Sequence, residues 1–124
     1  MTGSTDSPLF LFAGDSSDVP YVQATLERLP VDAFGHVFLE VATSVQIQSL
    51  RRPEGMSVHW LCRTDVGVDA TMSPRGARLE AATRAWLSEW MCGSDSGPRI
   101  IWIGATTIPA MSRLHDEIHH HHAG

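Results

Sequence analysis

Short apolar runs alternate with amphipathic segments along most of this sequence. The apolar runs predict four strands, at residues 9–13, 36–41, 58–62 and 100–104. The amphipathic segments carry apolar residues three or four positions apart, and they predict three helices, at residues 19–29, 75–91 and 108–118. Because uninterrupted apolar runs are typical of strands that are buried on both faces, we expect the strands to pair in parallel.

The alternation of strands and helices predicts an α/β fold. The expected architecture is a three-layer, doubly wound parallel sheet with helices on both faces and right-handed crossovers. The polar stretches at residues 42–54 and 64–74 are interpreted as connections between these elements. Apolar residues near the centres of the predicted elements give the expected core: Leu11, Val37, Phe38, Leu61, Trp86 and Ile101.

Length, charge and cysteine content narrow the class of protein further. The 124 residues suit one domain, and the formal net charge of −5 leaves no broad basic surface, so we expect no nucleic-acid partner. No apolar run is long enough to cross a bilayer and no leader is recognisable, so we expect no membrane insertion. With Cys62 and Cys92 far apart in the sequence, a reducing cytoplasm is the expected location.

Both ends of the chain are expected to lie outside the folded domain. Residues 1–8 are small and polar, which predicts a flexible N-terminus. Residues 119–122 are four consecutive histidines, which can chelate a transition metal. Their composition favours an unstructured His-rich tail at 119–124, either natural or part of a purification tag, and no metal site. The predicted domain therefore spans residues 9–118.

The end of the first strand carries candidate chemistry. Gly14 and Asp15 follow the apolar run, and Ser16 and Ser17 come next, before a helix with a proline in its first turn. Ser17 or the aspartate after it is the expected N-cap of that helix. Free N–H groups at such a helix start bind anions, phosphates above all, and a glycine lets a ligand approach the backbone. The alternative is that Gly14 and Asp15 serve only the geometry of the turn.

Two further strand ends carry polar residues or glycine. Arg63 follows the third strand, and Gly104, Thr106 and Thr107 follow the fourth. The carboxyl ends of parallel strands meet at one edge of the sheet, where open α/β folds bind their ligands. We therefore predict one binding crevice at this edge, formed by Gly14, Asp15, Ser16, Ser17, Arg63, Gly104, Thr106 and Thr107.

Five short motifs stand in order between residues 9 and 118. They are Gly-Asp-Ser-Ser-Asp-Val-Pro at 14–20, Leu-Glu-Arg-Leu-Pro at 26–30, Val-Phe-Leu-Glu-Val-Ala at 37–42, Val-His-Trp-Leu-Cys-Arg at 58–63 and Trp-Ile-Gly-Ala at 102–105. In these motifs the chain resembles the C-terminal NAD(P)H-binding domain of siderophore-interacting proteins, the bacterial ferric-siderophore reductases of the ferredoxin-reductase superfamily. That family's first motif reads Gly-Asp-Glu-Thr-Ala-Leu-Pro, and its last reads Trp-x-Ala-Gly-Glu.

The resemblance implies a ferredoxin-reductase-like nucleotide-binding domain that takes NADPH or NADH into the predicted crevice. Arg51 or Arg52 would meet the 2′-phosphate of NADPH, because the pair follows the second strand, where such folds place their ribose-binding residues. The family's flavin domain, with its Arg-x-Tyr-Thr type motif, has no counterpart in the sequence. We therefore expect no FAD on this chain, a separate flavin-binding protein as its partner, and no catalysis by this chain alone.

Two departures from the family motifs leave a second interpretation open. Ser16 stands where the first motif has glutamate, and Ala105 stands where the last motif has its acidic residue. The alternative is a degenerate, non-catalytic domain that acts in protein interaction or regulation.

Overall fold

The computed structural model describes residues 9–64, 76–90, 99–104 and 108–123. These residues form four strands, three α-helices and two short 3-10 turns. In chain order the elements are β1 (Leu9–Asp15), η2 (Ser16–Asp18), α1 (Val19–Arg28), β2 (Phe34–Val41), η3 (Ser44–Gln46), β3 (Gly55–Cys62), α2 (Ala77–Trp90), β4 (Arg99–Ile103) and α3 (Pro109–Ala123).

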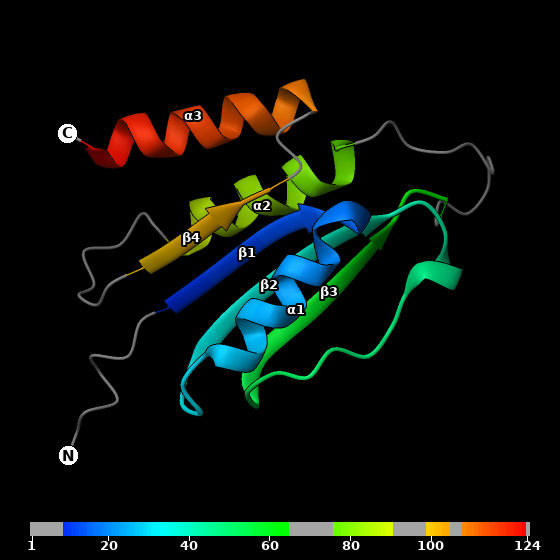
Figure 1. Cartoon of the computed structure of the whole chain (residues 1–124). Coiled ribbons are helices and arrows are strands. Elements are labelled where there is room, and N and C mark those ends of the chain that lie inside the picture. Colours follow the sequence, from blue (N-terminus) through cyan, green and yellow to red (C-terminus); the bar gives the residue numbers. More distant parts are fainter. Residues whose placement is uncertain (1–8, 65–75, 91–98, 105–107, 124) are drawn as a thin grey trace, which may run out of the picture.

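The four strands form one sheet in the order β3-β2-β1-β4, and every neighbouring pair is parallel. The chain moves outward from β1 to β3 and then returns past β1 to β4, so the winding direction changes between β1 and β4. Figure 1 shows the strands pointing the same way, with α1 starting close to the arrowhead of β1. The predicted α/β fold with a parallel sheet is confirmed, and its topological switch point lies at the carboxyl ends of β1 and β4.

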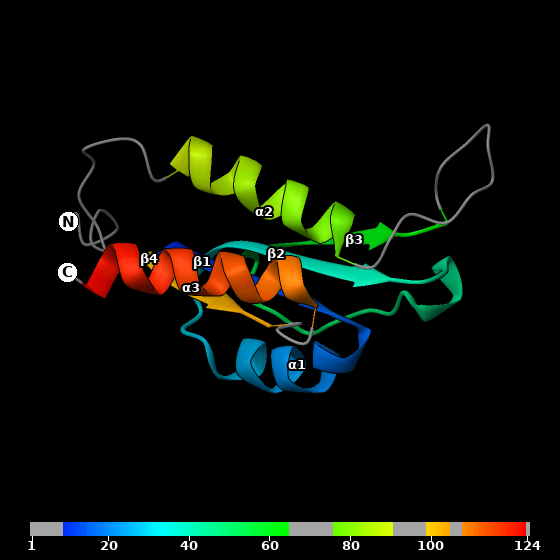
Figure 2. The ribbon, with the colours of Figure 1, turned by 90° about the horizontal axis from the view of Figure 1, so that it is seen from above.

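Helices cover both faces of the sheet, with α1 on one face and α2 on the other (Figure 2). Successive side chains of a strand point to opposite faces, so β1 contributes to both layers. Phe10 and Phe12 pack with Val22 and Leu26 of α1. The core on the opposite face lies between the strands, α2 and α3. It comprises one cluster of Ala13, Leu79, Ile103, Ile108, Met111 and Leu114 and a smaller one of Leu9, Leu11 and Trp86. These two cores account for the three layers.

The expected core is confirmed for Leu11, Val37 and Trp86, which are all buried. Phe38, Leu61 and Ile101 are only partly buried, against the clusters on the α2 side of the sheet. For Leu61 and Ile101 the reason is topological, because β3 and β4 are the two edge strands. Phe38 instead borders a hollow between β2 and α2, described below.

The C-terminal helix differs from the expectation of an unstructured His-rich tail. Helix α3 continues through residues 119–122 and ends at Ala123. No glycine or proline interrupts the chain between residues 110 and 123, and adding a residue to an existing helix costs far less than starting one. The expected flexible N-terminus at 1–8 lies outside the described residues. Within the part of the chain that is described, no helix combines the length and apolarity that crossing a membrane requires.

Candidate functional site

The ends of β1 and β4 lie side by side at the switch point. The N–H group of Gly104 donates a hydrogen bond to the carbonyl of Ala13 over 2.7 Å, which fixes the end of β4 beside β1. A Cβ atom on Gly14 would lie 2.8 Å from Oδ2 of Asp18, and a Cβ atom on Gly104 would lie 2.6 Å from the same oxygen. A side chain at either position would have to displace the carboxylate of Asp18, which lies against both strand ends.

The turn between β1 and α1 satisfies its own backbone groups. Oδ1 of Asp15 accepts hydrogen bonds from the N–H group of Ser17 at 3.0 Å and from its hydroxyl at 2.6 Å. Oδ2 of Asp18 accepts from the N–H group of Asp15 at 3.0 Å, which completes a capping box. Asp15 therefore binds local groups of the turn, and the hydroxyl of Ser17 already has an acceptor within the chain.

The expected N-cap of α1, Ser17 or Asp18, is wrong as a side-chain cap of that helix. Asp18 precedes α1, but its side chain makes no capping hydrogen bond to that helix. The side chain that caps is Asp15, at the start of η2. The N–H group of Val19 donates to the carbonyl of Ser16, and Pro20 has no N–H group to offer. Fewer donors therefore face an anion at this helix start than the sequence predicted.

The structure describes only one of the three other residues that were predicted at this edge. Arg63 follows β3, where its N–H group donates to the carbonyl of Val41 over 2.9 Å, and the residue is partly buried. It belongs to the same edge of the sheet, but β2 separates its strand from β1. Thr106 and Thr107 lie outside the described residues. The name switch-point site is used below for Gly14, Asp15, Ser16, Ser17, Asp18 and Gly104.

The structure places Arg51 and Arg52 at the opposite edge. The connection after η3 runs back beside α1 to the amino end of β3, as a parallel partner of β2 requires (Figure 1). Arg52 donates from Nε to the carbonyl of Met56 over 2.8 Å and from Nη1 to the carbonyl of Leu50 over 3.1 Å. A hollow of about 370 Å³ brings both arginines together with Glu27 of α1 and with Leu29, the C-cap of that helix.

The expectation that this arginine pair faces the binding edge is therefore wrong. A residue that follows β2 in the sequence does not have to lie at the carboxyl end of β2. The connection has already returned to the amino edge of the sheet when it reaches Arg51. Arg52 instead closes the loop that leads into β3. The switch-point site includes neither arginine.

An aromatic pair beside the switch-point site was not predicted. The rings of Tyr21 and Trp102 stack with centroids 4.7 Å apart and planes inclined by 28°. Cη2 of Trp102 would lie 2.4 Å from a Cβ atom on Gly104, so the indole ring covers this glycine. Tyr21 keeps 51% of its surface exposed. The signal in the sequence is the spacing of two residues between Trp102 and Gly104, which puts both on one face of β4.

Asp18 is the third residue of this region, after Tyr21 and Trp102, that the sequence did not assign to the site. Its side chain was assigned only to helix capping, whereas the structure places its carboxylate against Gly14 and Gly104. The signal was present in the first motif, where this chain has Asp18 and the motif of the resembling family has alanine.

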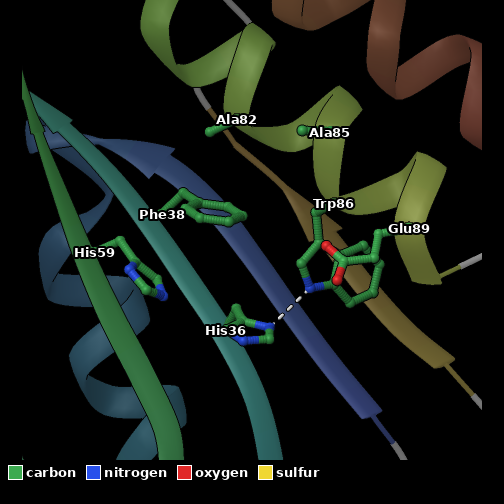
Figure 3. A pocket seen from close by; sticks show the side chains of 7 residues that line it. All are labelled: His36, Phe38, His59, Ala82, Ala85, Trp86 and Glu89. Carbon is green, nitrogen blue, oxygen red and sulfur yellow. Dashed lines mark hydrogen bonds between the residues drawn. The ribbon is translucent and has the colours of Figure 1, made fainter.

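A second hollow, of about 330 Å³, lies between α2 and the strands β2 and β3 (Figure 3). Seven residues line it: His36, Phe38, His59, Ala82, Ala85, Trp86 and Glu89. Nε1 of Trp86 donates to Nδ1 of His36 over 2.8 Å, so this ring nitrogen carries no proton. Burial, and then the neighbouring His59, lower the pKa of His36, while Glu89 opposes the shift. The described residues bring together no three His, Cys, Asp or Glu side chains able to hold a metal ion.

The fold defines an open α/β domain with a parallel four-stranded sheet and a topological switch point between β1 and β4. Residues 7–118 match the sequence profile of the family described as "Siderophore-interacting protein". The match covers most of the chain, and the chain belongs to this family.

Individual relatives agree with this assignment. An uncharacterized protein of Mycobacterium tuberculosis is 37% identical over 81 residues, which are 62% of this chain and 29% of that protein. Ferric vibriobactin reductase ViuB of Vibrio cholerae is 43% identical over 53 residues, which are 43% of this chain and 20% of ViuB. The chain thus spans less than a third of the length of either relative.

Solved structures give the same fold. A siderophore utilization protein from T. fusca superposes with a TM-score of 0.60 and 25% identity, covering 91% of this chain and 40% of that one. The siderophore-interacting protein SipS from Aeromonas hydrophila superposes with a TM-score of 0.50 and 20% identity, covering 77% of this chain and 38% of that one. At that identity the second likeness supports the fold alone.

Proposed function

We propose that this chain supplies the nicotinamide-nucleotide-binding part of an NAD(P)H-dependent flavin and ferric-siderophore reductase system. The observation that carries the proposal is the position of Gly14 and Gly104. Both stand at the topological switch point, where open α/β sheets bind ligands. Neither carries a side chain of its own, and the carboxylate of Asp18 occupies the space beside both. Membership of the siderophore-interacting protein family and the likeness to a ferric vibriobactin reductase support the same class of function.

In the proposed complex the nucleotide lies across the carboxyl ends of β1 and β4. Ser16 is exposed at the first turn, and the stacked pair of Tyr21 and Trp102 lies against Gly104. We assign phosphate contacts to the turn around Ser16 and the strand-end glycines, and a planar ring of the nucleotide to the aromatic pair. Arg63, Thr106 and Thr107 remain predicted contacts of this edge.

The chemistry of such a system divides between two components. A reduced nicotinamide held by this chain would supply a hydride, and a flavin held by the other component would carry its electrons to ferric iron. We assign to this chain the binding and orientation of the nucleotide, and we assign the flavin to another part of the system. We also propose a separate flavin-binding partner and a cytoplasmic location.

Titration calorimetry with NADH and NADPH tests this function. The proposal predicts a saturable heat for at least one nucleotide below millimolar concentration, and no heat with free FAD. Adenosine serves as the control, because it shares the adenine and ribose but carries no phosphate. Absence of saturable binding by both nucleotides would contradict the proposal.

A non-catalytic role in protein interaction or regulation is the second candidate. It is favoured by one specific observation, the two carboxylates of Asp15 and Asp18 in the turn where the nucleotide phosphates would lie. The same titration separates the candidates, because a degenerate domain folds normally and binds neither NADH nor NADPH.

A further inference from the structure

The side chain of Asp18 is held at the centre of the switch-point site. Oδ2 accepts the N–H group of Asp15 over 3.0 Å. The same oxygen lies 2.8 Å and 2.6 Å from the positions that Cβ atoms on Gly14 and Gly104 would take. The carboxylate thus fills the space that the two glycines leave open, at the point where the backbone would otherwise receive a ligand.

A second carboxylate reinforces this charge. Asp15 is 8% exposed, and its Oδ1 binds both donors of Ser17. Within the capping box, one carboxylate takes the place of an anion at the N–H groups of the turn, and the other lies over the strand ends. A pyrophosphate that approached Gly14 and Gly104 would meet the negative charge of Asp18 first.

We propose that Asp18 is an affinity-determining residue of the switch-point site, whose carboxylate opposes the pyrophosphate of a nicotinamide nucleotide. The proposal rests on the proposed function. Two unit charges a few ångströms apart near a protein surface repel strongly enough to change an affinity by about tenfold or more. NADH and NADPH would therefore bind more weakly to this chain than the glycines alone would allow, whereas a ligand without phosphate would be unaffected.

The test compares Asp18→Asn with the native chain by titration calorimetry, using NADH and adenosine as the two probes. Asparagine keeps the size of the side chain and an oxygen that accepts the Asp15 N–H group, so the turn is retained. Glu27→Gln is the matched control, because it removes the same charge from the exposed far end of α1. Asp18→Ala is the second variant, which removes the charge without introducing an amide.

The proposal predicts that Asp18→Asn and Asp18→Ala each raise the affinity for NADH by about tenfold or more. Glu27→Gln should leave that affinity unchanged, and no variant should alter the response to adenosine. High salt should shrink the difference between Asp18→Asn and the native chain, because ions screen partly exposed charges.

Each remaining outcome decides between this proposal and the proposed function. Equal NADH binding by the native chain and both Asp18 variants would overturn the role of Asp18 and leave the proposed function intact. Binding by the variants alone would support the role of Asp18 and contradict the proposed function of the native chain. Absence of NADH binding by all of them at millimolar concentration would overturn both.

Discussion

The buried carboxylate of Glu40, at the end of β2, accepts the backbone N–H group of Leu79 in the first turn of α2, over 3.2 Å. Its other oxygen accepts the N–H group of Gly76 over 2.7 Å, and Glu40 itself is 3% exposed. Helix starts carry unsatisfied N–H groups and partial positive charge, which a carboxylate neutralises. One side chain therefore joins the sheet to the helix that covers it.

A substitution at Glu40 tests how much these two hydrogen bonds and the charge contribute to stability. Glu40→Gln keeps the shape of the side chain but removes its charge and turns an amide NH₂ group toward backbone donors. We expect the free energy of unfolding to fall by about 1–3 kcal/mol, measured by urea denaturation. The exposed Glu27→Gln should change it by less than about 0.5 kcal/mol. Equal stability of the Glu40 variant and the native chain would show that the charge of Glu40 contributes nothing net to stability.

Arg52 gives a prediction about the amino edge. Its guanidinium joins the carbonyls of Leu50 and Met56, so Arg52→Ala should lower the free energy of unfolding by about 0.5–1.5 kcal/mol. Arg51→Ala removes an exposed side chain of the same chemistry and should leave stability unchanged. If either variant bound NADPH more weakly than the native chain while binding NADH normally, our placement of the pair outside the binding site would be contradicted.

Arg51 and Arg52 also show which feature of the fold the sequence did not predict, namely the edge of the sheet at which a long connection places its residues. The four strands and their parallel pairing were predicted from local apolar runs, because an uninterrupted apolar run is typical of a strand buried on both faces. The course of residues 47–54 depends on β3 starting level with β2, in the register of Phe34 with Gly55. Sequence spacing placed Arg51 after a strand but carried no information on how far the connection returns.

The switch-point site was predictable in part for the same reason. Glycine at the ends of β1 and β4 pointed to the correct edge, because strand direction follows from the order of elements. The aspartates of this turn were harder, since the rotamers that direct Asp15 to Ser17 and Asp18 to the glycines depend on the folded turn. The stacking of Tyr21 on Trp102 joins α1 to β4, a contact between distant segments that periodicity does not reveal.

The contact between His36 and Trp86 predicts a pH dependence of stability. Burial and His59 lower the pKa of His36 in the folded state, so the unfolded chain binds more protons as the pH falls below the ordinary histidine value, about 6.5. This contribution is fully present above that value and is lost as the pH decreases toward the lowered pKa. His36→Gln keeps an acceptor for the Trp86 N–H group but does not titrate.

Denaturant unfolding of the native chain and His36→Gln at successive pH values between about 7.5 and 5.5 measures this term. The native chain should lose more stability over that range than the variant does. His115→Gln, on the surface of α3, is the control and should follow the native chain. Parallel stability curves for the native chain and the His36 variant would rule out a contribution from His36.

The assignment of the flavin to another component gives a spectroscopic prediction. The purified chain should show no visible flavin absorbance, and it should not reduce a ferric siderophore when NADPH is the only addition. The physical reason is that the proposed site receives the nicotinamide nucleotide only. A yellow protein with FAD in a one-to-one ratio would contradict this assignment, and so would reduction without an added flavoprotein.

In the proposed complex, a nicotinamide nucleotide binds at the carboxyl edge of the sheet, between β1 and β4. The most direct measurement is an amide NMR titration of the native chain with NADH and with NADPH. Binding there should give saturable shifts of the Gly14, Ser16 and Gly104 amides and leave the amides of Arg51 and Arg52 unmoved. Shifts centred on the arginines or on the hollow beneath α2, or no shifts at millimolar nucleotide, would contradict it.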